Sequence, residues 1–97
     1  MLQNYAMLFE FMQTLGKKWT VPLLLFLLFY KESNFSEIKK NLKMTSRALS
    51  KKLKLLEALG LVERIIIENP KKAYYSLSEK GMAVSQMVIK FAASFSE

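Results

Sequence analysis

The segment Lys43–Leu61 (K-M-T-S-R-A-L-S-K-K-L-K-L-L-E-A-L-G-L) decides the fold, because it predicts an amphipathic helix with a signal at each end. Thr45 or Ser46 can cap the N-terminus, since a side-chain oxygen there accepts a hydrogen bond from a free backbone N–H. Gly60 follows the last apolar turn, where a left-handed residue commonly ends a helix. At about 100° per residue, one face collects the leucines that we expect in a core, which are Leu49, Leu53 and Leu56.

The opposite face of this segment is cationic. Its basic residues and the serines at its edge are Arg47, Lys51, Lys54, Ser46 and Ser50. No acidic residue occurs in the segment before Glu57. The outer face of a single helix is usually only a solvated surface, so the neighbouring segments decide whether this one binds a ligand.

The composition limits the possible functions. The chain has 97 residues, enough for one domain over residues 1–97, and its 15 basic and 8 acidic residues give a net charge of +7. A small basic protein favours a polyanionic partner, either nucleic acid or an anionic membrane surface. Cys, His and Asp are absent, which excludes disulfides and thiolate metal sites and leaves scattered Glu residues. We therefore expect no enzyme activity, no cofactor and no metal site.

Two apolar segments precede the basic helix. The first predicts a helix within Met1–Thr14, and its apolar residues at helical spacing are Tyr5, Leu8, Phe9, Met12 and Leu15. After a break at Leu15–Lys18, the run Trp19–Tyr30 predicts a buried helix that begins near Lys18, with Pro22 in its first turn. This run is shorter than the ~20 residues that a bilayer requires, and no signal peptide precedes it. We expect a cytoplasmic protein without a membrane segment.

A second helix lies directly before the basic one. Asn34 and Glu37 have the spacing of a capping box, which predicts a helix from there to Leu42. A few residues then lead into the basic helix, so residues 34–61 follow the order of a helix-turn-helix. The turn contains no glycine and is a weak signal by itself.

A β-hairpin is predicted directly after the basic helix. Residues 61–68 are rich in β-branched side chains, residues 73–77 form the returning strand, and Asn69-Pro70-Lys71-Lys72 fits the turn. A hairpin over 61–77 in this position is a wing, with Lys71 and Lys72 at its tip and Arg64 on its first strand. Lysines on a hairpin can also serve only to protect an edge strand, but the basic helix beside them favours contact with DNA.

The chain ends in another apolar helix. Ser78 can cap it, and it is expected to continue through Phe95, with an apolar stripe at Val84, Val88, Phe91 and Phe95. A small winged helix cannot cover both this helix and the first one, and large uncovered apolar surfaces imply a partner. We therefore expect the helices within residues 1–15 and 78–97 to form a homodimer.

Four blocks of sequence resemble the HxlR family of winged-helix transcription regulators, relatives of the MarR group. The blocks are Leu15–Leu24, Asn34–Leu42, Met44–Arg64 and Tyr75–Gly81. The resemblance implies a mainly α (α+β) fold with a helix-turn-helix, a β-hairpin wing and terminal dimerisation helices. It places the recognition helix at residues 45–59 and the wing tip at 68–73. The thiol switch of some members cannot apply without Cys, and another MarR-like subfamily remains an alternative with the same fold.

These observations predict a sequence-specific regulator that binds double-stranded DNA as a homodimer, with the recognition helix in the major groove and the wing on the phosphate backbone. The expected DNA-binding residues are Thr45, Ser46, Arg47, Ser50, Lys51, Lys54, Arg64, Lys71 and Lys72. Arg47 favours base recognition, because Arg pairs well with guanine and the chain otherwise prefers Lys.

Two alternatives remain open. One is a winged helix that coats DNA without reading bases or that contacts proteins. The other is a peripheral membrane protein, which is disfavoured because the lysines and the apolar stripes lie on different helices. No motif identifies a small-molecule effector.

Overall fold

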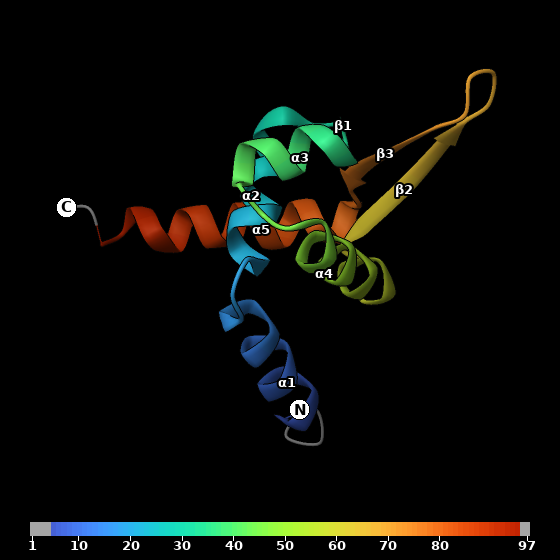
Figure 1. Cartoon of the computed structure of the whole chain (residues 1–97). Helices are drawn as coiled ribbons and strands as arrows, with labels where there is room; N and C mark the ends of the chain where they lie inside the picture. Colours follow the sequence, from blue (N-terminus) through green and yellow to red (C-terminus); the bar gives the residue numbers. More distant parts are fainter. Residues whose placement is uncertain (1–4, 96–97) are drawn as a thin grey trace.

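The computed structural model describes residues 5–95 as a mixed α+β chain (Figure 1). The elements are α1 (Tyr5–Gly16), α2 (Thr20–Tyr30), β1 (Ser33–Asn34), α3 (Phe35–Leu42), α4 (Ser46–Ala58), β2 (Val62–Ile67), β3 (Lys72–Leu77) and α5 (Glu79–Ala93). The predicted fold class is confirmed. The parts of the predicted terminal helices at 1–4 and 96–97 lie outside the described residues, as do the side chains at positions 5, 7 and 8.

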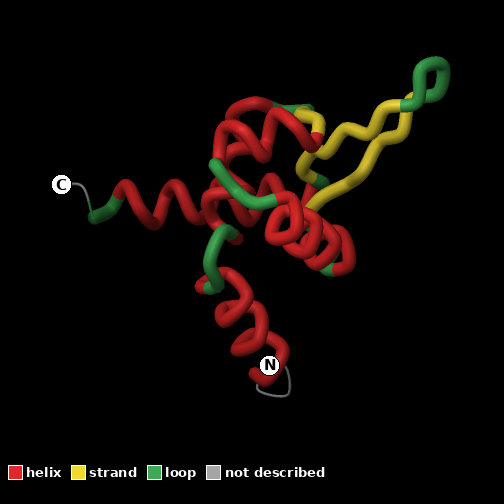
Figure 2. The backbone as a smooth tube through the Cα atoms, viewed as in Figure 1, coloured by secondary structure: helices red, strands yellow, loops and turns green. Residues whose placement is uncertain are grey.

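The three strands form one antiparallel sheet in the order β1-β3-β2. The hairpin is confirmed, with register from Val62 opposite Leu77 to Ile67 opposite Lys72, and Figure 2 shows it projecting from the helices. Strand β1 was not expected, because the sequence from Lys31 to Ser33 indicated only the end of a helix. Two residues carry no periodic pattern, and β1 exists because Ser33 and Asn34 pair with β3. This pairing holds the start of α3 against the base of the wing.

The core lies between α2, α3, α4, the start of β2 and the first half of α5. Its buried apolar residues are Leu23, Leu24, Phe26, Leu27, Ile38, Met44, Leu49, Leu53, Leu56, Leu61, Val62 and Val84. The predicted inner face of α4 is confirmed, since its three leucines are at most 1% exposed. Fully burying one such side chain contributes roughly 1.5–3 kcal/mol, so these leucines fix the rotation of α4 about its axis.

The predicted helix ends are largely confirmed. The Thr45 hydroxyl accepts a hydrogen bond from the Ala48 N–H at 3.1 Å, and Asn34 and Glu37 form the expected capping box. Gly60 is left-handed, with φ of 76°. Helix α2 begins at Thr20, slightly later than expected, and keeps Pro22 in its first turn. The turn before α4 contains no glycine, and its left-handed residue is Lys43, with φ of 56°.

Gly81 has a structural role that its helix propensity hides. A Cβ atom at this position would collide with the carbonyl oxygen of Leu61. The backbone N–H of Ser78 donates to that same oxygen at 3.0 Å, and the Ser78 hydroxyl donates to the Gly60 carbonyl at 2.6 Å. Gly81 therefore lets the first turn of α5 lie directly against the junction between α4 and β2.

The terminal helices project from this body in different directions (Figure 1). Helix α1 extends through Gly16 into the expected break, and α5 ends at Ala93 rather than at Phe95. Both carry exposed apolar side chains, which are Phe9, Met12, Met82, Met87 and Phe91. The two helices share an apolar groove of about 260 Å³, lined by Met12, Leu15, Met87, Val88 and Phe91. None of the helices within residues 5–95 has the length and apolar character needed to cross a membrane.

Candidate nucleic-acid interface

The outer face of α4 presents three cations to solvent. Because the leucine face is held in the core, Arg47, Lys51 and Lys54 point outward and are exposed. Within residues 5–95, the ion pair between Arg64 and Glu57 is the one salt bridge, so no carboxylate lies within 4.0 Å of these three cations. The structure thus brings together the predicted basic residues of this helix on one unneutralised face.

The polar candidates at the start of α4 differ in what they can contact. Ser46 and Arg47 are exposed in the first turn, where recognition helices contact base edges. Thr45 is exposed, but its hydroxyl already accepts the Ala48 N–H and fixes the start of the helix. Ser50 is half-buried and lies at the edge of the basic face. Ser46 and Arg47 therefore have the freest approach to a groove.

The wing carries the remaining predicted cations. Lys71 lies in the turn and Lys72 begins β3, and both are exposed at the projecting tip (Figure 2). Arg64 lies on β2, close to the base of the hairpin. Its Nε atom is 3.8 Å from Oε1 of Glu57 on α4. Arg64 thus lies between the wing and the helix, apart from the two lysines at the tip.

Sequence analysis missed a second group of lysines beside α4. The loop between α1 and α2 places Lys17 and Lys18 at an open hollow of about 740 Å³ that Lys51 and Lys52 also line. The Lys52 Nζ donates to the Thr20 hydroxyl at 3.1 Å. Burial lowers the pKa of Lys52 below its usual value, and the charges of Lys17 and Lys51 lower it further. Only the tertiary fold joins these segments, because Lys52 and Thr20 are 32 positions apart.

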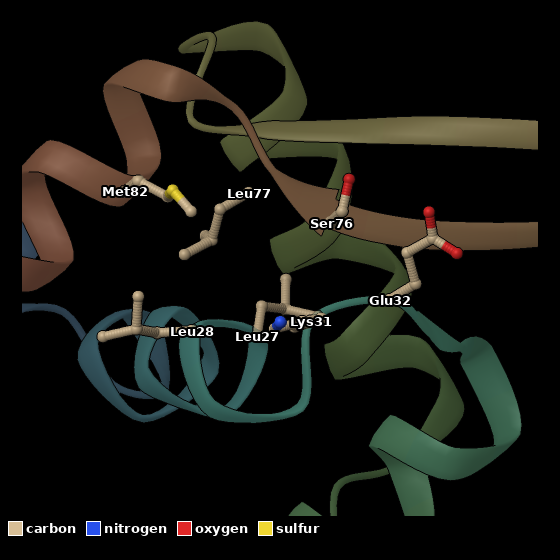
Figure 3. A pocket seen from close by; sticks show the side chains of 7 residues that line it. All are labelled: Leu27, Leu28, Lys31, Glu32, Ser76, Leu77 and Met82. Atoms are coloured by element: carbon tan, nitrogen blue, oxygen red, sulfur yellow. The ribbon is translucent and has the colours of Figure 1, made fainter.

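A different hollow, of about 260 Å³, lies between α2, β3 and α5 (Figure 3). In Figure 3 the side chains of Leu28, Leu77 and Met82 line it, with Lys31 and Glu32 also on its wall. Because the lining contains one lysine and one glutamate, this hollow has no net charge that would favour an anion. Among residues 5–95, no group of three or more His, Cys, Asp or Glu residues could hold a metal ion. The α4 face and the wing remain the surface best suited to a polyanion.

Comparison with known proteins supports this conclusion. The sequence model of the HxlR-like helix-turn-helix family matches residues 14–96. The HTH-type transcriptional regulator YvaP of Bacillus subtilis is 41% identical over 76 residues, which are 76% of this chain and 69% of that protein.

Solved structures show the same fold. The reduced form of the transcriptional regulator YodB from B. subtilis has a TM-score of 0.76 at 32% identity, over 87% of this chain and 83% of that chain. A MarR-family regulator from Enterococcus faecalis has a TM-score of 0.86 at 23% identity, over 96% of this chain and 86% of that chain.

The family match covers the helix-turn-helix, the wing and α5. It confirms the resemblance that the sequence blocks indicated. It also confirms the expectation that the chain is not an enzyme, because members of this family are transcriptional regulators. The chain belongs to the HxlR-like helix-turn-helix family and is a DNA-binding transcriptional regulator.

Proposed function

We propose that the chain recognises specific sequences in double-stranded DNA as a homodimer, with α4 in the major groove and the tip of the wing on the phosphate backbone. The observation that carries the proposal is the exposed face of α4, where Arg47, Lys51 and Lys54 have no carboxylate within 4.0 Å among residues 5–95. The duplex carries about one negative charge per 1.7 Å of its axis, so such a face gains by releasing counterions.

The cations have different tasks in this proposal. Arg47, assisted by Ser46, contacts base edges, because a guanidinium can donate two parallel hydrogen bonds to O6 and N7 of guanine. Lys51 and Lys54, with Lys71 and Lys72 of the wing, bind phosphates, which positions the protein without selecting a sequence. Thr45 and Ser50 make supporting contacts at the helix edge. Arg64 lies at the base of the wing, where its pairing with Glu57 limits its contact with the DNA backbone.

The second copy is proposed from the terminal helices. Phe91 is 69% exposed and Met12 is 60% exposed in the single chain, and both line the apolar groove between α1 and α5. A two-fold interface built on these helices would cover that groove and present both copies of α4 to one face of the duplex. The two copies would enter major grooves about 34–36 Å apart, one turn of DNA. Residues 1–97 act as one domain, in the cytoplasm.

A second candidate is a protein that coats DNA without reading bases. The lysine-rich composition favours it, since the chain has only two arginines and Arg64 is paired. Under this alternative, Arg47 is one more phosphate contact. The two candidates therefore differ in what Arg47 does on different sequences.

The experiment compares Arg47→Ala, Arg47→Lys and Lys72→Ala on a duplex selected from random sequence and on an unselected duplex, across a range of salt concentrations. We expect Arg47→Ala to weaken binding by roughly 1–3 kcal/mol on the selected duplex and much less on the other, as a base contact does. Arg47→Lys keeps the charge but loses the paired hydrogen bonds, so it should resemble Arg47→Ala on the selected duplex.

Lys72→Ala should weaken both duplexes equally. It should also make the salt dependence shallower, by about 0.9 in the logarithmic slope for each lost phosphate contact. If Arg47→Ala and Lys72→Ala have the same effect on both duplexes, base recognition by Arg47 is wrong and the coating function replaces it.

A further inference from the structure

The outer edge of the wing is an exposed apolar strand. The sheet has the order β1-β3-β2, so within residues 5–95 one edge of β2 has no strand beside it. Three consecutive side chains on β2 are apolar and exposed, since Ile65, Ile66 and Ile67 are 37%, 45% and 47% exposed. Figure 1 shows the outer part of the hairpin projecting beyond α4. Such an edge presents a row of unpaired backbone N–H and C=O groups next to apolar side chains.

This edge lacks the usual protection against pairing. Soluble proteins commonly place lysine, proline or a bulge on an exposed edge strand. Here Pro70 and Lys71 lie in the turn and Lys72 begins β3, so none of them is on β2. The pairing of β2 with β3 is also uninterrupted from Val62 to Ile67, without a bulge that would twist the edge away. The strand is therefore open to another β-strand, whose main chain would complete its hydrogen bonds.

The sequence of β2 is complementary to a second copy of itself. Two copies that run antiparallel form a continuous sheet only if opposing side chains lie on the same face, and successive side chains alternate between faces. The two-fold axis must therefore pass through a residue and not between two residues. If the axis passes through Ile66, that residue faces its own copy and Ile65 faces Ile67. Arg64 then faces Glu68, at each end of the isoleucine row.

The other positions of the axis give poorer pairs. An axis through Arg64 places two guanidinium groups opposite each other. An axis through Ile65 places Arg64 opposite Ile66, and an axis through Ile67 places Ile66 opposite Glu68. Opposite charges and β-branched side chains that face each other across strands are stabilising, whereas like charges are destabilising. The register centred on Ile66 is thus the one that matches apolar with apolar and cation with anion.

The charged residues at the two ends are available for this contact. Glu68 directly follows β2, is exposed, and has no Lys or Arg nitrogen within 4.0 Å among residues 5–95. The side chain of Arg64 is 49% exposed, and its contact with Glu57 at 3.8 Å is longer than a hydrogen bond. Arg64 can therefore accept a second carboxylate from another chain.

We propose that β2 is a self-association surface, which joins two copies of this chain by antiparallel pairing of residues 64–68 about Ile66. The two hairpins become one sheet in which the strands follow the order β3-β2-β2-β3. Backbone hydrogen bonds between the two edges hold the copies together, and the isoleucine and Arg64–Glu68 pairs fix the register. The contact uses the edge of the wing and leaves the lysines of the turn exposed.

This surface is separate from the groove between α1 and α5. In Figure 1 the wing projects away from both terminal helices, so one contact does not cover the other. Pairing through β2 can therefore join two of the dimers that the terminal helices form, and this consequence rests on the proposed function. A two-fold contact uses the same patch on both copies, as the self-complementary strand requires. The pairing itself needs neither DNA nor the α1–α5 groove.

Single cysteines test the register directly. The chain has no Cys, so a disulfide of a single-cysteine variant must join two chains. The full chain is oxidised with copper phenanthroline in the absence of DNA, and the products are separated on a non-reducing gel. Ile66→Cys should cross-link with itself, because each thiol faces its own copy. Ile65→Cys and Ile67→Cys should each cross-link poorly alone, since diagonal positions are too far apart, but efficiently when the two are mixed.

Charge reversal tests the pairs at the ends of the strand, with the Ile66→Cys cross-link as the readout. Arg64→Glu and Glu68→Arg should each lower its yield severalfold, because like charges then face each other. A mixture of the two variants should restore the yield, since every opposing pair again has opposite signs. Both variants keep a positive net charge, so attraction between whole chains does not explain the recovery. Glu63→Arg carries the same charge change on β2 and should not replace Glu68→Arg in the mixture.

The proposal is wrong if Ile66→Cys forms no cross-linked product. It is also wrong if the three cysteine variants cross-link equally well alone, because the exposed strands would then meet without a register. A charge-variant mixture that does not recover would exclude the Arg64–Glu68 pairs and overturn the register. Adding Phe91→Lys to Ile66→Cys should leave the cross-link unchanged. None of these measurements contains DNA, so their outcome is separate from that of the Arg47 experiment.

Discussion

The Nε atom of Arg64 lies 3.8 Å from Oε1 of Glu57, which connects the first strand of the wing to the last turns of α4. The two side chains are 49% and 30% exposed, so the pair contributes about 0–1 kcal/mol to stability. The contact gives the two arginines of the chain different environments. Arg64 is already paired, whereas Arg47 is exposed at the start of α4 with no carboxylate nearby among residues 5–95.

Glu57→Gln should strengthen DNA binding. The change removes a negative charge beside the proposed interface and frees Arg64 for a phosphate, so affinity should rise on all sequences and the salt dependence should become steeper. The free energy of unfolding should change by less than ~1 kcal/mol. Glu32→Gln, on the loop between α2 and β1, removes the same charge elsewhere and is the control for both measurements. Equal gains in the two variants would show that only the net charge matters.

The three glycines of the chain should respond differently to alanine. Gly81→Ala should destabilise the fold by about 1–3 kcal/mol or more, because the added Cβ meets the Leu61 carbonyl and the backbone must shift. Gly60→Ala should cost roughly 1–2 kcal/mol, since its φ of 76° disfavours any Cβ. Gly16 lies in α1, where an added Cβ would meet no other part of the described chain within 4 Å beyond its own helix turn, so Gly16→Ala should be neutral or stabilising. Denaturant unfolding of the three variants checks this order.

The glycines also show which parts of the fold the sequence could predict. Gly60 was predicted correctly, because a glycine after an apolar helical stripe is a local signal. The role of Gly81 could not be predicted, because its contact with Leu61 joins two segments that local pattern cannot connect. Caps and helix faces are local in the same sense, and the structure confirms them at Thr45, Asn34 and Ser78.

The candidate site likewise contains residues whose positions the sequence predicted and residues whose positions it did not predict. The outward positions of Arg47, Lys51 and Lys54 follow from helical periodicity, once the leucine face is known to be buried. The position of Lys17 and Lys18 beside α4 could not be predicted from the sequence, because a break between two helices does not indicate which element it packs against. Strand β1 was missed for the same reason, since its two residues are a strand only through pairing with β3.

Leu53 and Leu55 form a matched pair for testing the rotation of α4. Leu53 is 1% exposed and Leu55 is 36% exposed on the same helix. Leu53→Ala should cost roughly 2–5 kcal/mol in the free energy of unfolding, from lost burial and the cavity left behind. Leu55→Ala should cost less than ~1 kcal/mol. Similar losses in the two variants would mean that α4 presents a different face to the core, and the basic face would then be assigned wrongly.

Phe91 and Phe29 test where a second copy binds. Both are exposed in the single chain, at 69% and 67%, but only Phe91 lines the groove between α1 and α5. We expect a dimer by sedimentation or light scattering at micromolar concentration. Phe91→Lys should shift it to monomer, because a lysine there would be desolvated in the interface. Phe29→Lys, which adds the same charge on α2, should leave the dimer intact.

The loss of the dimer should also appear in DNA binding. In a dimer, once one copy of α4 has bound its half-site, the other copy binds the adjacent half-site in a nearly intramolecular step, which raises the overall affinity. A monomer does not have this increase in affinity. Phe91→Lys should therefore bind a two-half-site duplex much more weakly, but a single half-site about as well as the unaltered chain does. A dimer that survives Phe91→Lys and dissociates with Phe29→Lys would place the interface on α2 instead. If the unaltered chain is a monomer, the predicted dimer is wrong, and so is the expected recognition of two half-sites.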